Sequence, residues 1–203
     1  MIESHTENFK EFKMCTKLKE LNGLTPEEIL NKYWNSERNV YPIDIAKILY
    51  KMNIRALPYD FSKFDDGNID NRILGAMVAN KTDLALLYRQ GETLNRSRFT
   101  LAHELAHCCL AHLDDQKMPY VEYRHDGVVT ESCEIKANTF AGELLVPTKE
   151  LRKILSVEYP DSLPQVTKLA KMFAVSLNVM KERLKQLEIP YIDEYDRKNF
   201  CLE

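Results

Sequence analysis

At 203 residues the chain can hold one globular domain with a sizeable core, or one such domain with a small appendage. Its net charge of −3 argues against a protein that is basic overall and coats nucleic acid, while 44% hydrophobic and 29% charged residues are ordinary for a globular protein. No apolar run approaches the ~18 residues of a membrane span, so we expect no membrane partner.

The first residues and the cysteines indicate the compartment. The chain begins Met-Ile-Glu-Ser-His-Thr-Glu-Asn, which is not the pattern of a signal peptide. Its five cysteines are an odd number, and Cys108 and Cys109 are adjacent, which does not look like a disulfide framework. We therefore expect a cytoplasmic protein with reduced cysteines.

The N-terminal quarter predicts an arm and two helices. Residues 1–22 are charged and weakly patterned, so we expect them to be loosely ordered. Thr25-Pro-Glu-Glu28 is a capping box with proline at the first helical position, and it opens a helix that runs to about Ser36. A second helix follows Pro42, and its inner face comprises Ile45, Ile48, Leu49 and Met52.

Three strand-like runs come next, at residues 54–59, 73–79 and 84–88. Asn80-Lys-Thr-Asp83 reads as the turn between the last two runs. We expect these segments to form a small antiparallel sheet.

His103-Glu104-Leu105-Ala106-His107 is an H-E-x-x-H motif in a predicted helix at about residues 96–112. Four residues is close to one helical turn, so the imidazoles project from one face about 6 Å apart along the axis, near enough to bind one zinc ion. Glu104 is rotated by roughly 100° and lies beside the metal, where a carboxylate can take a proton from water. The motif predicts a hydrolytic metal site rather than a helix with two unrelated histidines.

A single-zinc hydrolase needs a third protein ligand and leaves one position for water. His112 lacks the spacing of the extended metzincin motif, and position 110 is leucine where that motif bends at glycine. We therefore reject His112 as a ligand.

Glu134 is the better candidate for the third ligand. It lies in a second predicted helix, at residues 131–145, with Thr130 as a plausible N-cap. Asn138 is one turn further on the same face, where its amide can accept a hydrogen bond from a ligating histidine and orient the ring. The competing acidic residues, Glu131 and Glu143, have no such turn-spaced partner.

The sequence pattern of residues 166–187 is typical of a helix-turn-helix, with Ala174-Val175-Ser176 as the turn and Ser176 capping the next helix. If that helix entered a DNA groove, Lys181, Arg183 and Lys185 could meet phosphates. Because the chain is acidic overall, we favour a helical hairpin that packs on the rest of the protein without touching DNA.

The two motif helices together resemble a known family. Arg98-Phe-Thr-Leu-Ala-His-Glu-Leu-Ala-His107, followed by Glu134-x-x-Ala-Asn-x-Phe-Ala-x-Glu-Leu-Leu-Val-Pro147, is similar to the ImmA/IrrE family of metallo-endopeptidases, whose active-site core is similar to that of the gluzincins. The resemblance covers roughly residues 25–190. Family members commonly carry a further histidine soon after the first motif, and here His112 is spaced slightly differently.

The resemblance implies a site and a substrate. His103, His107 and Glu134 would bind one Zn2+ per chain, and Glu104 would act as the general base that activates water. Family members cleave DNA-binding repressors, so the implied partner is a helix-turn-helix repressor that controls a prophage, a mobile element or a stress regulon. Cys108 and Cys133 adjoin two of these residues, and we interpret them as small buried residues rather than redox sensors.

The resemblance also implies how a peptide would bind. In gluzincin-like sites an edge strand holds the extended substrate by main-chain pairing, and we expect residues 84–88 to be that edge. The loop from Leu113 to Val129 holds four candidate donors to the developing oxyanion, namely Tyr120, Tyr123, Arg124 and His125.

The predicted fold is therefore α+β, with N-terminal helices, a small antiparallel sheet, two active-site helices and a C-terminal helix-turn-helix-like segment. We expect a loosely ordered arm at residues 1–22, a zinc metalloprotease domain at 23–158, and the C-terminal segment and tail at 159–203.

Three classes of function remain open. The first is a zinc endopeptidase. The others are a DNA-binding regulator with a structural zinc site, and a non-catalytic antirepressor that acts by binding alone. Glu104 favours the first class, because a structural zinc site does not need a carboxylate next to its first ligand.

Overall fold

The computed structural model describes residues 16–34, 41–62, 73–80, 82–112, 120–123 and 131–194. It has an α+β fold, as predicted. The elements in chain order are α1 (Thr16–Leu21), α2 (Pro26–Tyr33), α3 (Ile45–Lys51), β1 (Arg55–Tyr59), β2 (Gly75–Ala79), β3 (Leu84–Arg89), α4 (Leu94–Cys109), β4 (Tyr120–Tyr123), α5 (Glu131–Leu145), α6 (Thr148–Glu158), α7 (Val166–Phe173) and α8 (Leu177–Gln186). Across these ranges, none of the helices has the length and apolar composition to cross a membrane.

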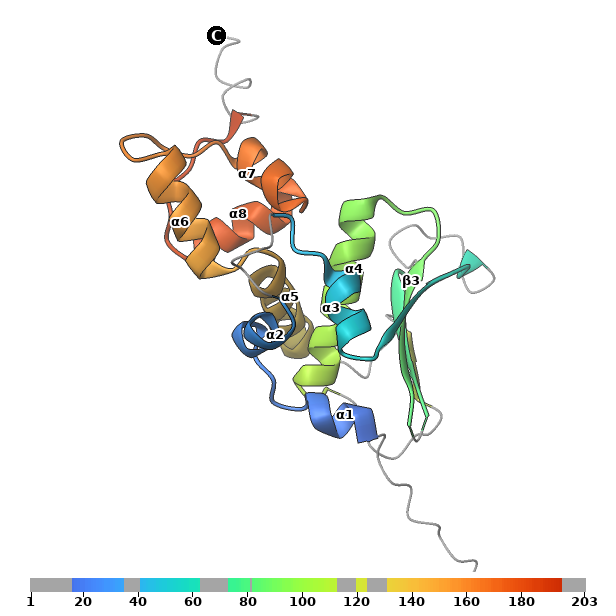
Figure 1. Ribbon diagram of the computed structural model, residues 1–203. Coiled ribbons are helices and arrows are strands. Elements are labelled where there is room, and N and C mark those ends of the chain that lie inside the picture. The colour runs from blue at the N-terminus through green and yellow to red at the C-terminus, as the bar shows by residue number, and fades with distance from the viewer. Residues whose placement is uncertain are drawn as a thin grey trace, which may run out of the picture.

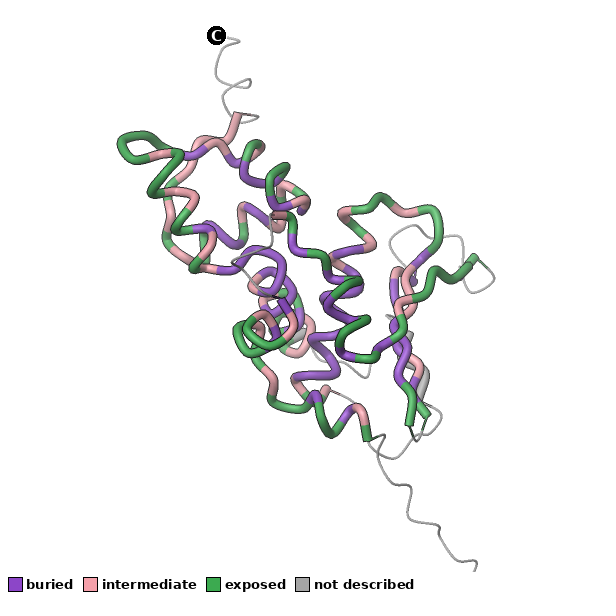
Figure 2. The backbone as a smooth tube through the Cα atoms, in the orientation of Figure 1, coloured by how far each residue is buried: buried purple, intermediate pink, exposed green. Residues whose placement is uncertain are grey.

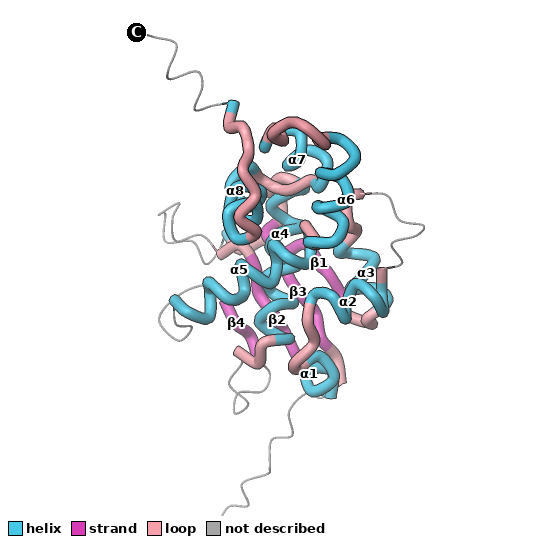
Figure 3. The backbone as a smooth tube through the Cα atoms, turned by 90° about the vertical axis from the view of Figure 1, so that its left-hand side faces the viewer, coloured by secondary structure: helices cyan, strands magenta, loops and turns pink. Residues whose placement is uncertain are grey.

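Helix α4 occupies the centre of the fold. The sheet lies on one side of it and α5 on the other, while α6, α7 and α8 gather at one end of the molecule (Figures 1 and 3). Every residue from Thr100 to Cys109 is buried, and Figure 2 shows this continuous buried stretch in the middle of the tube. A helix that is enclosed all round holds its polar side chains in fixed positions, which suits a site built on it.

The sheet is mixed, not antiparallel as predicted. Its strand order is β1-β3-β2-β4, and β3 pairs in parallel with β1 and antiparallel with β2. The run at 84–88 that we expected at the edge is therefore an interior strand. Its composition explains this: Leu84, Ala85 and Leu86 form a continuous buried run, as interior strands do.

Strands β1 and β4 form the two edges of the sheet. Strand β1 contains Pro58, which lacks the N–H that a central strand would need, so an edge position suits it. Strand β4 pairs antiparallel with β2, with Ala76 opposite Tyr123 and Ala79 opposite Tyr120. This fourth strand was absent from the sequence-based prediction.

The N-terminal helices follow the prediction except at their ends. The Thr25–Glu28 capping box is present, although α2 ends at Tyr33 rather than near Ser36. Residues 16–21 of the expected loose arm form α1, because Leu18 and Leu21 are apolar enough to enter the core. Residues 1–15 lie outside the described part of the chain.

The C-terminal helix-turn-helix-like hairpin forms as expected. Helices α7 and α8 flank a turn in which Ala174 is left-handed (φ 49°) and the Ser176 hydroxyl accepts a hydrogen bond from the N–H of Val179. Of the three basic residues of α8, Lys185 is exposed, whereas Lys181 and Arg183 have partners within the protein. Arg183 is only 3% exposed and donates to Glu143 and Thr148, and Lys181 is paired with Asp193. Arg183 is therefore engaged in contacts within the protein, while the absence of a DNA contact stays a prediction.

Arg98 links the α7–α8 hairpin to helix α4. Its buried guanidinium donates to the carbonyl oxygens of Phe173 and Ala174, at the end of α7, and to that of Ile43 at 2.6 Å. Cations are favourable at a helix C-terminus, because the carbonyls there carry partial negative charge. One side chain thus joins three segments that are far apart in the sequence.

We expect Arg98→Met to lower the free energy of unfolding by about 3 kcal/mol, because methionine keeps the volume but leaves three buried carbonyl oxygens without their donor. Urea unfolding followed by circular dichroism measures this loss. Arg96→Met, on the exposed side of the same helix, is the control and should change stability by less than about 0.5 kcal/mol. Equal stability of the two variants would contradict the anchoring role.

Candidate metal centre

Helix α4 brings the two histidines of the motif together. The Thr93 side chain caps the helix, and one turn separates His103 from His107. Their Nε2 atoms lie 2.8 Å apart, and the residues are 0% and 4% exposed. The imidazoles therefore point the same way from a rigid, enclosed support, as the four-residue spacing predicts.

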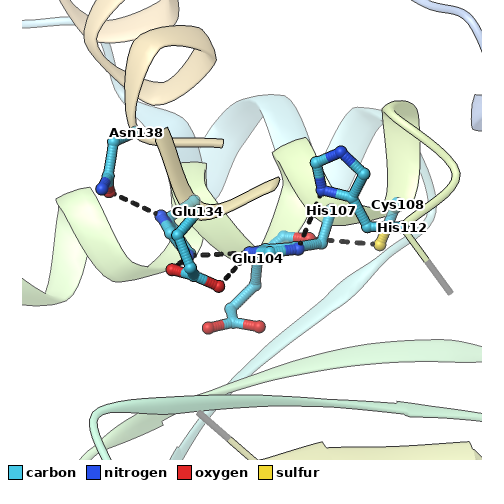
Figure 4. Close-up of polar contacts among 7 residues, drawn as sticks. Glu104, His107, Cys108, His112, Glu134 and Asn138 are labelled. Carbon is cyan, nitrogen blue, oxygen red and sulfur yellow. Dashed lines mark hydrogen bonds and ion pairs between the residues drawn. The ribbon is translucent and has the colours of Figure 1, made fainter. Parts of the chain in front are cut away.

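Helix α5 supplies the third group. The Glu134 carboxylate reaches both rings, with Oε2 3.3 Å from Nε2 of His103 and Oε1 3.3 Å from Nε2 of His107 (Figure 4). Hydrogen bonding with His103, and then with His107, holds the pKa of the Glu134 carboxyl well below its usual range. Glu134 is therefore ionised at neutral pH, which is the form that binds metal.

The geometry fits a single divalent cation. The ligand atoms of His103, His107 and Glu134 all lie within 4.8 Å of one another. Donors on a tetrahedral zinc ion at bonds of ~2.0–2.1 Å are about 3.3 Å apart, which matches both nitrogen–oxygen distances. The two nitrogens would separate by roughly 0.5 Å to reach the same spacing. Two imidazoles and a carboxylate are a common donor set for zinc.

Each histidine also has a polar contact at its other ring nitrogen, Nδ1. Nδ1 of His103 lies 2.9 Å from Oδ1 of Asn138, and Nδ1 of His107 lies 3.2 Å from Nδ1 of His112. When both Nδ1–H groups donate outward, both Nε2 lone pairs face Glu134, ready for a cation. Burial, and after it the nearby His107 and Lys136, lower the pKa of His112, which favours its neutral, accepting form.

Asn138 has the position predicted for it, whereas the contact made by His112 was missed. From its spacing, His112 was assessed only as a possible metal ligand. Its contact to His107 follows from the way the chain leaves α4, where Ala111 adopts a left-handed φ of 52°. No helical spacing predicts that turn.

We expect Asn138→Ala to weaken metal binding by roughly ten- to a hundredfold, because His103 loses the acceptor that fixes its tautomer. Competition with a chromogenic chelator measures the change. Ser132→Ala, an exposed position on the same helix, is the control. If both variants bind metal as the wild type does, the contact with Asn138 does not support the site.

Glu104 lies beside the cluster. It is 4% exposed, and its side chain extends from α4 towards the strands of the sheet (Figure 4). The thiol of the neighbouring Cys108 lies 3.2 Å from the sulfur of Met77 and 3.3 Å from the carbonyl oxygen of Glu104, so it can donate its one proton to either of them rather than to the cluster. Burial raises the pKa of Cys109 to about 12, so this thiol is unreactive.

Of the four candidates for the oxyanion donor, Arg124 and His125 lie outside the described residues, while Tyr120 and Tyr123 belong to β4. Their role stays a prediction. Ile135, which follows Glu134 in α5, is 58% exposed and does not contribute to the core.

Comparison with known families agrees with this geometry. A family model of peptidases described as the IrrE N-terminal-like domain matches residues 62–185. The match includes both motif helices and continues through α7 into α8. No curated protein is significantly similar to the chain.

Proposed function

The chain belongs to the IrrE N-terminal-like family of peptidases, and on that premise we propose that it is a zinc-dependent endopeptidase that cleaves a DNA-binding repressor. The observation that supports the chemistry best is the convergence of His103, His107 and Glu134 beside a buried Glu104. Among the described residues only these three form such a cluster, so a zinc ion bound there would have three protein ligands and keep one position for water, as catalytic sites need.

We assign metal binding, proton transfer and orientation of the imidazoles to different residues. A zinc ion held by the three ligands would polarise the scissile carbonyl and make water more acidic. Glu104 takes a proton from the attacking water and returns it to the nitrogen of the leaving amine. Asn138 and His112 keep the two imidazoles oriented throughout the reaction.

Strand β4 is our candidate for holding the substrate. Its outer edge is not paired within the described sheet, and its Tyr123 end lies opposite Ala76, next to Gly75 of β2. An ideal Cβ built on Gly75 would be 2.6 Å from Oε1 of Glu104, so this end of the sheet lies close to the proposed base. A peptide added to β4 by main-chain pairing would run past Glu104.

The two other classes of function account for less of the site. A regulator with structural zinc would need a fourth protein ligand, and a binding-only antirepressor would need neither Glu104 nor the metal. The buried Arg183 and the ion pair of Lys181 also leave α8 with few cations for DNA phosphates.

The direct test is to incubate the purified zinc-loaded protein with the repressor encoded beside its gene, with and without EDTA. We expect one cut in the repressor, located by mass spectrometry, and none in the presence of EDTA. Restoring zinc after EDTA should restore cleavage. An intact repressor under all conditions, with a metal-loaded protein, would contradict the proposed substrate; cleavage that persists in EDTA would contradict the metal-dependent mechanism.

A further inference from the structure

The backbone of β2 comes unusually close to Glu104 at Gly75. An ideal Cβ on this residue would lie 2.4 Å from Cγ2 of Thr100, 2.6 Å from Oε1 of Glu104 and 3.1 Å from Cδ of Glu104. Such separations are shorter than van der Waals contact between these atoms, which begins near 3.5 Å. Only glycine leaves the carboxylate in its present place.

The backbone conformation does not require glycine at this position. Gly23 and Gly91 have positive φ values of 84° and 85°, but Gly75 is not among the positive-φ residues and lies in the regular pairing of β2 with β3, opposite Tyr88. An alanine could adopt this conformation. The reason for glycine is therefore the space taken by the two side chains of α4.

We propose that Gly75 is a positioning residue for the general base: the missing side chain forms the space in which the Glu104 carboxylate is held between α4 and β2. This inference rests on the proposed function, because it assumes that the place of Glu104 matters for catalysis. Helix α4 is enclosed on all sides, so it cannot move away to make room. Thr100 is β-branched and stiff, whereas Glu104 is flexible at its far end. An added methyl group would therefore displace the carboxylate.

The first test is the kinetics of Gly75→Ala. A base displaced by about 1 Å can cost roughly a hundredfold in rate, so we expect kcat to fall by about that factor with little change in KM or in bound zinc. Thr100→Ser removes the Cγ2 atom at 2.4 Å but leaves the conflict with Glu104. The Gly75→Ala, Thr100→Ser double variant should thus regain stability while kcat stays low. Full kcat in Gly75→Ala, or its return in the double variant, would overturn the proposal.

Gly142→Ala is the matched control. This glycine lies in α5, and an added Cβ would meet no atom within 4 Å. Alanine is also the better helix former, so we expect an unchanged kcat and a melting temperature raised by roughly 2 °C.

The second test does not use activity and so separates this inference from the proposed function. The comparison is made in a metal-free Thr100→Ser background, which removes the Cγ2 atom that lies 2.4 Å from the added Cβ. There Gly75→Ala should still lower the melting temperature by roughly 3 °C, because the conflict with Glu104 remains. When Glu104→Ala is added to that background, the same change should cost less than half as much, because the opposing carboxylate is gone. An equal loss with and without the Glu104 side chain would overturn the inference even if the wild type cleaves its substrate. If Gly75→Ala does not fold in the Thr100→Ser background, recovery of folding by Glu104→Ala supports the inference and failure to recover overturns it.

Discussion

Glu104→Gln should abolish catalysis while leaving the metal centre intact. Glutamine has nearly the same shape but cannot take a proton from water, and a positioned general acid–base contributes about a hundred- to ten-thousandfold to the rate. We therefore expect kcat to fall by roughly a thousandfold. Zinc content and melting temperature should match the wild type, because Glu104 is not among the three clustered ligands.

The measurement is single-turnover cleavage of the repressor, together with metal analysis of the same sample. Glu182→Gln makes the same chemical change on the exposed face of α8 and should cleave at the wild-type rate. Wild-type activity in Glu104→Gln would exclude the proposed mechanism. Loss of zinc in this variant would instead make Glu104 part of the metal site.

Glu134→Ala should remove the metal and with it both activity and metal-dependent stability. The change leaves only two imidazoles, so we expect zinc affinity to fall by more than about a hundredfold. A ligand present at a thousand times its Kd stabilises the folded state by about 4 kcal/mol. For a chain of this size that corresponds to a rise in melting temperature of roughly 10 °C on adding zinc to the wild type, and the variant should show almost none of it.

Calorimetric scans with and without zinc test this expectation, and isothermal titration gives the affinities. Glu143→Gln is the control on the same helix, since Glu143 pairs with Arg183 at 3.2 Å rather than with the cluster. It should keep one zinc ion per chain even where it lowers the baseline stability. Equal zinc-induced shifts in the Glu134→Ala variant and the wild type would rule out Glu134 as a ligand.

Local spacing accounts for the clustering of the candidate site residues. The pair His103–His107 and the pair Glu134–Asn138 are each four residues apart on one helix, so helical geometry alone placed each pair on one face. The capping box at Thr25 and the cap at Ser176 also depend only on near neighbours, and both are present. The boundary between the domain at 23–158 and the C-terminal segment at 159–203 stays a prediction.

The features that could not be predicted from the sequence depend on contacts between residues far apart in the chain. The position of β3 inside the sheet follows from pairing with β1, about thirty residues earlier, which the alternation of side chains does not encode. Strand β4 is only four residues long, and β3 and α4 separate it in the sequence from its pairing partner β2. The sequence pattern of such a short strand is weak. The burial of Arg183 likewise depends on α5 and α6, and composition alone suggested an exposed cation.

The enclosure of α4 has an evolutionary consequence. From Thr100 to Cys109 no position is open to solvent, so nearly every replacement there disturbs packing, and His103, Glu104 and His107, which we propose perform the chemistry, are constrained together. The exposed Ile135 is under no such restriction. Substitutions at exposed positions of this kind should therefore accumulate in evolution faster than substitutions within α4.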